Sequence, residues 1–144
     1  MKTFLSLLKP QLFLLAFGLL AFASVANMSC TPRYSQEAVD SATNLKTALG
    51  DLMGKATTSP YSKNTAAITK VQEALSKAAM QAESLKNNKD MAKAWKTLAD
   101  GLVAPFLAKW KEKETLSAAF VKEATDQVTK SLDAILKAEM GKKK

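Results

Sequence analysis

Apolar residues recur at alternating intervals of three and four through four segments of the chain. Ile68, Val71 and Leu75 in the second segment show this spacing, with polar residues between them. Residues at these intervals fall on one face of an α-helix, so each segment predicts an amphipathic helix that buries its apolar face against the others. The four segments are 34–53, 64–86, 89–113 and 115–140.

The four predicted helices are similar in length and are joined by short connections. At about 1.5 Å per residue they extend ~30 to ~39 Å. Glycine and proline, which disfavour helices, account for only five and four of the 144 residues. We expect an all-α, antiparallel up-down-up-down four-helix bundle over residues 34–140. Gly54 is expected to end the first helix, while Asn64 and Thr115 cap the second and the last.

A proline in the third segment leaves two interpretations of that helix. Pro105 lacks a backbone donor, and its ring crowds the carbonyl of Gly101. Either the helix kinks at Pro105 and continues to about Lys113, or it stops near Asp100 and a short helix begins at the proline. The apolar stripe keeps its phase across the proline, which favours one kinked helix. The alternative architecture is a three-helix bundle with an irregular segment at this point.

The N-terminal region has the pattern of a signal peptide. Residues 1–11 contain Lys2 and Lys9 and no acid, and residues 12–26 form an apolar run. As a helix this run would rise only ~22 Å, short of the ~30 Å hydrocarbon core, which disfavours a retained transmembrane anchor. We therefore expect residues 1–26 to be removed and the remainder to be exported to the periplasm or cell envelope.

Cys30 offers a second position for the end of this leader. Cleavage after Ala26 would follow small residues at Ser24 and Ala26, as a general signal peptidase requires. A bacterial lipoprotein precursor instead carries its single cysteine just after the apolar run, and Cys30 lies there, preceded by Ser29, although Asn27 stands where an aliphatic residue is usual. Cys30 is the only cysteine and has no internal disulfide partner, so lipidation would remove an otherwise reactive thiol. Both positions stay open, with lipid attachment at Cys30 favoured.

Residues that commonly carry catalysis or bind metals are scarce. The chain has no histidine and one cysteine, which removes the commonest general base and the usual transition-metal and haem ligands. No glycine-rich phosphate-binding loop occurs. Asp126 and Asp133 precede Lys130 and Lys137 by four residues, the spacing of exposed ion pairs on a helix. We expect no enzymatic activity, no metal and no cofactor.

Aromatic residues gather in the third segment and at the start of the last. They are Trp95, Phe106, Trp110 and Phe120. One interpretation is a hydrophobic pocket for an apolar ligand or a partner. The other is the bulkiest layer of the core, because aromatic residues at helical spacing usually belong to the core.

Basic residues collect at one end of the predicted bundle. The formal net charge is +8, and it falls to +6 when Lys2 and Lys9 leave with the leader. In an antiparallel four-helix bundle, the two termini and the turn between the second and third helices lie at the same end. The tether, residues 30–33, starts at Cys30 and leads into the bundle at this end. We expect this end to contact an anionic membrane surface, although an exposed, merely solubilising tail is the other interpretation. The basic residues there are Arg33, Lys86, Lys89 and, in the tail 141–144, Lys142, Lys143 and Lys144.

These features favour a non-enzymatic, membrane-anchored envelope lipoprotein that binds a protein or an envelope component. The alternative is a soluble periplasmic or secreted carrier of an apolar ligand, held in a pocket near Trp95 and Trp110. Nucleic acid is not expected as a partner, because export separates the chain from it and Arg33 is the only arginine.

Residues 31–144 expressed alone should fold without metal or haem, because the apolar seams supply the core and no histidine is present as a ligand. The far-ultraviolet circular dichroism spectrum should be strongly helical and unchanged by a chelator. A spectrum that becomes helical only after a metal is added would contradict this prediction.

Overall fold

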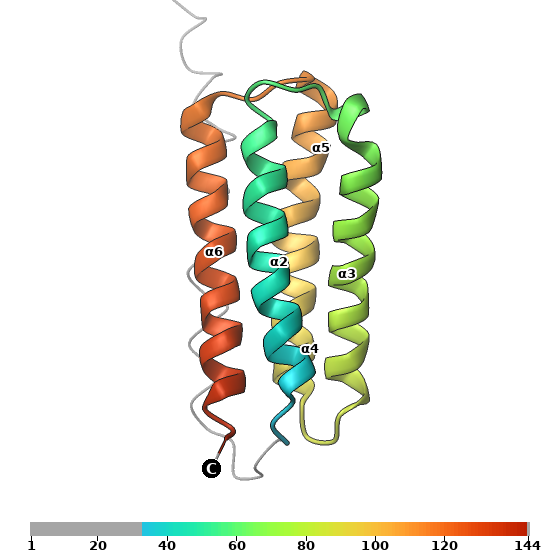
Figure 1. Ribbon diagram of the computed structural model, residues 1–144, viewed down its shortest axis with the longest axis vertical. Helices are drawn as coiled ribbons and strands as arrows, with labels where there is room; N and C mark the ends of the chain where they lie inside the picture. The colour runs from blue at the N-terminus through green and yellow to red at the C-terminus, as the bar shows by residue number, and fades with distance from the viewer. Residues whose placement is uncertain (1–32, 144) are drawn as a thin grey trace, which may run out of the picture.

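The apolar seams form four helices that run alternately up and down (Figure 1). The computed structural model describes residues 33–143. Its elements are α2 (Gln36–Lys55), the 3₁₀ turn η1 (Tyr61–Asn64), α3 (Thr65–Ser84), a third helix made of α4 (Lys89–Lys96), η2 (Thr97–Val103) and α5 (Ala104–Lys113), and α6 (Ala118–Met140). The predicted all-α four-helix bundle is confirmed, and the three-helix alternative is wrong.

Each helix packs against two neighbours, and the seams meet along the centre of the bundle. α2 lies between α3 and α6, and the third helix completes the ring by contacting α3 and α6 (Figure 1). The seam residues Leu49, Leu75 and Leu132 are no more than 2% exposed. Burying a leucine side chain stabilises the fold by about 1.5–3 kcal/mol, so these seams supply the main driving force for folding.

Several ends of the helices differ from the sequence-based expectation: α2 begins at Gln36 and α3 ends at Ser84, two residues inside the predicted bounds, and three expected caps are also changed. Gly54 lies inside the last turn of α2, which continues to Lys55. α6 is capped by Ser117, whose hydroxyl accepts from the Phe120 amide, and not by Thr115. Asn64 does precede α3, but its side-chain amide donates back into the loop rather than capping the helix. Only α6 gains a replacement side-chain cap, from Ser117, and the apolar seams keep their register at all three places.

The third helix continues across Pro105, and its irregularity lies on the N-terminal side of the proline. Thr97–Val103 is π-helical, and the Ala104 amide donates to the Ala99 carbonyl five residues back. Pro105 follows this bond and donates no backbone hydrogen bond itself, and α5 continues beyond it to Lys113. The expectation of one continuous helix is confirmed, whereas the kink at Pro105 stays a prediction; the irregular segment of the backbone is the π-helical stretch Thr97–Val103.

Trp110 holds together the two loops at the end of the bundle away from the termini. Its side chain is fully buried, and its Nε1 donates to the carbonyls of Ser59 and Glu114, each at 3.0 Å. The ring also meets Tyr61 edge-on, with centroids 5.7 Å apart. The Leu116 amide donates to the Ala56 carbonyl beside it at 2.8 Å. One indole therefore fixes the α2–α3 loop against the α5–α6 loop.

Replacing Trp110 with Phe should destabilise the protein more than replacing Trp95 with Phe. Both indoles are at most 1% exposed, but only the Nε1 of Trp110 donates hydrogen bonds to protein groups in the described residues. The difference should be about 1–3 kcal/mol, the cost of leaving a buried carbonyl unpaired. Urea unfolding of the two variants measures it, and equal losses would show that the two carbonyls find other donors.

Candidate functional site

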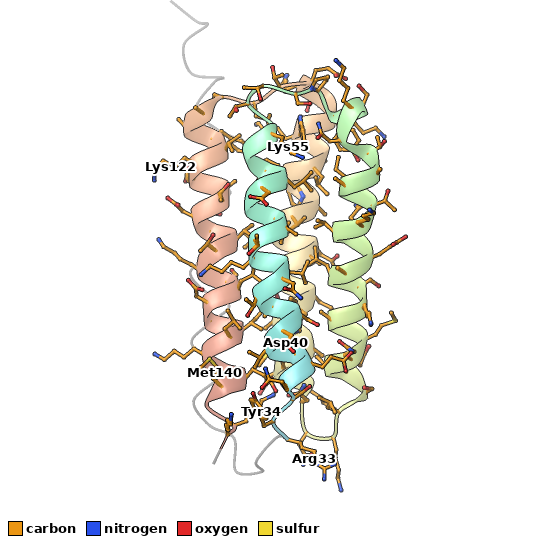
Figure 2. The ribbon with its side chains drawn as sticks, viewed as in Figure 1. Arg33, Tyr34, Asp40, Lys55, Lys122 and Met140 are labelled. Carbon is orange, nitrogen blue, oxygen red and sulfur yellow. The ribbon has the colours of Figure 1, made fainter. Side chains whose placement is uncertain are left out.

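Three segments that are distant in the sequence meet at one end of the bundle, here called the terminal end. They are the entry of the chain at Arg33, the α3–α4 turn and the C-terminal residues after α6 (Figures 1 and 2). This is the shared end that the antiparallel topology predicted. The predicted leader 1–26, Cys30 and Lys144 lie outside the described residues.

Four of the predicted basic residues are exposed at the terminal end. They are Arg33, Lys86, Lys89 and Lys143. The Arg33 side chain points away from the helices at the bottom of Figure 2. The Lys143 ammonium lies 5.4 Å from the centre of the Tyr34 ring, a cation–π contact. The exposed carboxylates here are Glu37, Glu83 and Asp90, so the four exposed bases exceed the exposed acids by one.

Lys142 does not belong to this exposed basic surface, and the prediction that it does is wrong. Its side chain is only 8% exposed, and its Nζ lies 2.5 Å from Oε2 of Glu139, which is 1% exposed. The same ammonium donates to Oδ1 of Asn88 at 2.6 Å. The first lysine of the predicted tail is thus folded back into the bundle, held by a carboxylate on the last turn of α6.

Glu139 and Asn88 extend this ion pair into a buried polar network. Oε1 of Glu139 accepts from the Ser35 amide at 2.9 Å, and the Asn88 side-chain amide donates to the Ala82 carbonyl at 3.1 Å. The network therefore joins the start of α2, the end of α3, the α3–α4 turn and the end of α6. A buried ion pair is tolerated when such additional hydrogen bonds satisfy both groups, and that condition is met here.

The spacing of residues in the sequence indicates part of this network, whereas the amino-acid composition does not. Val128, Leu132 and Ile135 form the seam of α6, and the next position at the same spacing is Glu139. A carboxylate at a core position requires a partner, and Lys142 three residues later is within reach on the same face. The approach of Asn88 and Ser35 depends on the tertiary structure, so no local pattern indicates it.

The four aromatic residues do not line one pocket. Trp95 and Trp110 are fifteen residues apart on one helix, a rise of ~22 Å, and both are buried. Phe106 stacks on Phe120 with centroids 6.0 Å apart and meets Trp110 at 6.3 Å, so these three form a layer of the core. A hollow beside Phe106 and Phe120 measures only about 60 Å³, against the ~300 Å³ or more of a typical ligand pocket.

Charged groups elsewhere on the described surface form exposed pairs. The hydrogen bond from Lys122 lowers the pKa of Asp126, and the bond from Lys113 lowers the pKa of Glu112. Asp133 is paired with Lys46 of α2 at 2.6 Å. The partners of the two aspartates are therefore Lys122 and Lys46 rather than the expected lysines four residues later. Each exposed pair contributes little to stability.

Residues 33–143 contain no group of three or more Asp, Glu, Cys or His side chains placed to hold a metal ion. Within the same residues, no helix has the length and hydropathy needed to cross a bilayer. No family model matches the chain, and no curated protein or solved structure matches it either. The fold defines the class, an all-α four-helix bundle.

Replacing Lys142 with Met should destabilise the bundle on the order of 3 kcal/mol, because it leaves the buried carboxylate of Glu139 without its counter-charge. Urea unfolding measures the change. The matched control is Lys143→Met, which removes the same charge from an exposed neighbour and should change stability by no more than about 1 kcal/mol, the contribution of its cation–π contact with Tyr34.

A second substitution distinguishes lost charge pairing from lost packing. In the double variant Glu139→Gln, Lys142→Met the amide oxygen still accepts from the Ser35 amide and no buried charge remains, so part of the stability should return. Equal unfolding free energies for Lys142→Met and Lys143→Met would show that the ion pair does not stabilise the fold.

Proposed function

We propose that this protein is a non-enzymatic, exported helical bundle, anchored in a membrane by lipid on Cys30 and by its basic terminal end. In this position it would bind a protein or another component of the cell envelope. The observation that supports the proposal most is that the chain enters the bundle at the end where Arg33, Lys86, Lys89 and Lys143 are exposed.

The first supporting step is the short distance between the lipid and the bundle. Arg33, where the described chain starts, is the third residue after Cys30, and a fully extended stretch of three residues spans ~10 Å. A bundle held by so short a tether would lie with its terminal end at the headgroups. The helices would then point away from the membrane, because α2 runs directly from this end.

The second step is the chemistry of the terminal end. Basic side chains near an anionic bilayer are attracted by about 1 kcal/mol each. Tyr34 lies beside Lys143, and Met140, 59% exposed, projects from the last turn of α6 near the same end (Figure 2). An aromatic ring and an apolar side chain among bases suit the interface between headgroups and acyl chains. A single acyl chain binds only marginally, so a basic surface is a useful second signal.

The third step concerns the part of the bundle that faces away from the membrane. Its far end is closed by Trp110, and the described residues offer no cluster of groups suited to metal chemistry there. Binding through the exposed helix faces is therefore the activity that the proposal assigns to it.

Replacing Cys30 with Ala should release the protein from membranes if Cys30 carries lipid. Detergent-phase partitioning of the wild type and the variant measures the release, and the intact mass of the wild type shows the acyl modification directly. A wild-type N-terminus at Asn27 with an unmodified thiol would refute the lipid anchor.

Removing three lysines from the terminal end should weaken binding to anionic vesicles of phosphatidylglycerol by about 3 kcal/mol, roughly a hundredfold, at low salt. The protein carries Cys30→Ala so that lipid does not dominate, and co-sedimentation with vesicles is measured. The variant replaces Lys86, Lys89 and Lys143 with Gln.

The matched control removes the same charge from the opposite end of the bundle. It replaces Lys55, Lys63 and Lys111, all exposed, with Gln. The control should bind more tightly than the terminal-end variant, and high salt should abolish the difference. Equal losses in both triple variants would show that net charge, and not the terminal end, governs binding.

A further inference from the structure

A groove runs along the outer face of the bundle between α3 and the third helix. Its volume is about 300 Å³. Four buried apolar residues form its floor: Leu75, Ala79, Val103 and Leu107. Exposed residues form its rims: Gln72, Ser76, Met80 and Glu83 on α3, and Lys96, Asp100 and Ala104 on the third helix.

Small side chains and the π-helical segment leave this groove open. Ser76 and Ala79 on α3 face Ala99 and Ala104 across it, and none of these is large enough to fill the space. Ala99, Asp100 and Val103 belong to η2, the π-helical segment. π-helical segments are rare and are frequently found at functional sites.

Met80 projects from the α3 rim of the groove. It is 59% exposed, and among the described residues only Met140 is an equally exposed large apolar side chain. Met140 lies at the terminal end, where the proposed membrane contact accounts for it. Met80 has no such explanation, and a flexible thioether beside an open apolar groove is suited to insert into a partner surface.

At one level the two rims carry opposite charges, Glu83 on α3 and Lys96 on the third helix, and Asp100 adds an acid one turn beyond Lys96. Oε1 of Glu83 lies 3.2 Å from Nζ of Lys96, and both side chains are more than half exposed. Because α3 and the third helix are antiparallel, this contact sets the register and brings Met80 level with Ala99. Consider a two-fold axis that runs along the groove, parallel to the helices. It would place α3 of one copy against the third helix of the other, and each residue would keep its position along the axis. Glu83 of each copy would then face Lys96 of the other, and Met80 would face the small Ala99.

We propose that the groove binds a second copy of this chain in a parallel two-fold dimer. The parallel arrangement rests on the proposed function, because it directs both terminal ends toward the same membrane. From Gln72 to Glu83 the groove is ~16 Å long, so the interface is smaller than the standard ~800 Å² per partner and association in bulk solution is weak. Confinement of both copies to one membrane raises their effective concentration and favours the dimer.

Sedimentation equilibrium of the full chain in density-matched non-ionic detergent tests the dimer. The wild type should show a reversible monomer–dimer equilibrium. Met80→Glu should weaken association at least about tenfold, because it places a carboxylate against the partner's groove. Met140→Glu is the matched control, since it changes an equally exposed methionine outside the groove, and it should associate like the wild type.

A charge exchange between two chains tests the reciprocal pairing itself. Glu83→Lys alone sets two lysines against each other at both contacts of the dimer, and Lys96→Glu alone sets two glutamates against each other. Each single variant should therefore be mainly monomeric. An equimolar mixture of the two restores opposite charges at both contacts and should recover the dimer. Far-ultraviolet circular dichroism of each variant confirms that the bundle is folded.

A wild type that stays monomeric at every concentration overturns the proposal, as does a mixture that remains monomeric. Weaker association of Met140→Glu than of Met80→Glu would place the interface elsewhere and also overturns it. Cross-linking of another protein to the groove of a monomeric chain would assign the groove to a different partner. Since the measurement is made in detergent, its failure is separate from failure of the membrane anchor, which vesicle binding and partitioning test.

Discussion

The burial of four apolar seams against one another is the constraint on which the other features of this structure depend. A seam at intervals of three and four covers only one face of each helix, so no helix is stable alone, and each must lie against two others. Short connections then permit only antiparallel neighbours. That topology brings the entry of the chain, the α3–α4 turn and the end of α6 together. The terminal end is thus a consequence of core packing.

The helices and their order could be predicted from the sequence because periodicity is repeated over many residues and survives small errors. The ends of helices depend on one or two residues and were less certain. Ser117 and Thr115 are both reasonable caps, and only the path of the α5–α6 loop selects Ser117. The π-helical segment was not predicted either. It reflects a choice between two nearly equivalent hydrogen-bonding registers, and the packing of Leu98 and Val103 into the core helps to decide it.

For the candidate site, too, one part could be predicted from the sequence and another part could not. That the basic residues share one end follows from topology, and the sequence was sufficient for it. Whether each ammonium is exposed depends on its surroundings. Lys142 and Lys143 are adjacent in a run of three lysines, yet one lies in a buried ion pair and the other lies over the Tyr34 ring. The difference arises because Glu139 occupies a core position on α6, and a buried carboxylate draws in the nearest cation. The two lysines are equivalent in composition, but in the structure the side chain of Lys142 is buried and that of Lys143 is exposed.

The two ends of the bundle are closed by interactions of different chemistry, and this bears on how the terminal end is held. At the far end Trp110 fills the space between two loops and donates to two backbone carbonyls. At the terminal end the groups that meet are a carboxylate, an ammonium, a side-chain amide and a backbone amide. Apolar residues of similar volume stabilise a fold as well as a buried ion pair does, but they impose no fixed partners. The network requires Ser35 and Lys142 to reach Glu139, and Asn88 to accept from the same Lys142 ammonium. It therefore fixes the entry of the chain relative to the α3–α4 turn, and hence the positions of Arg33, Lys86 and Lys89 relative to one another. A surface that acts through several weakly attracted charges gains from such fixed spacing, because the side chains lose less conformational freedom when they bind together.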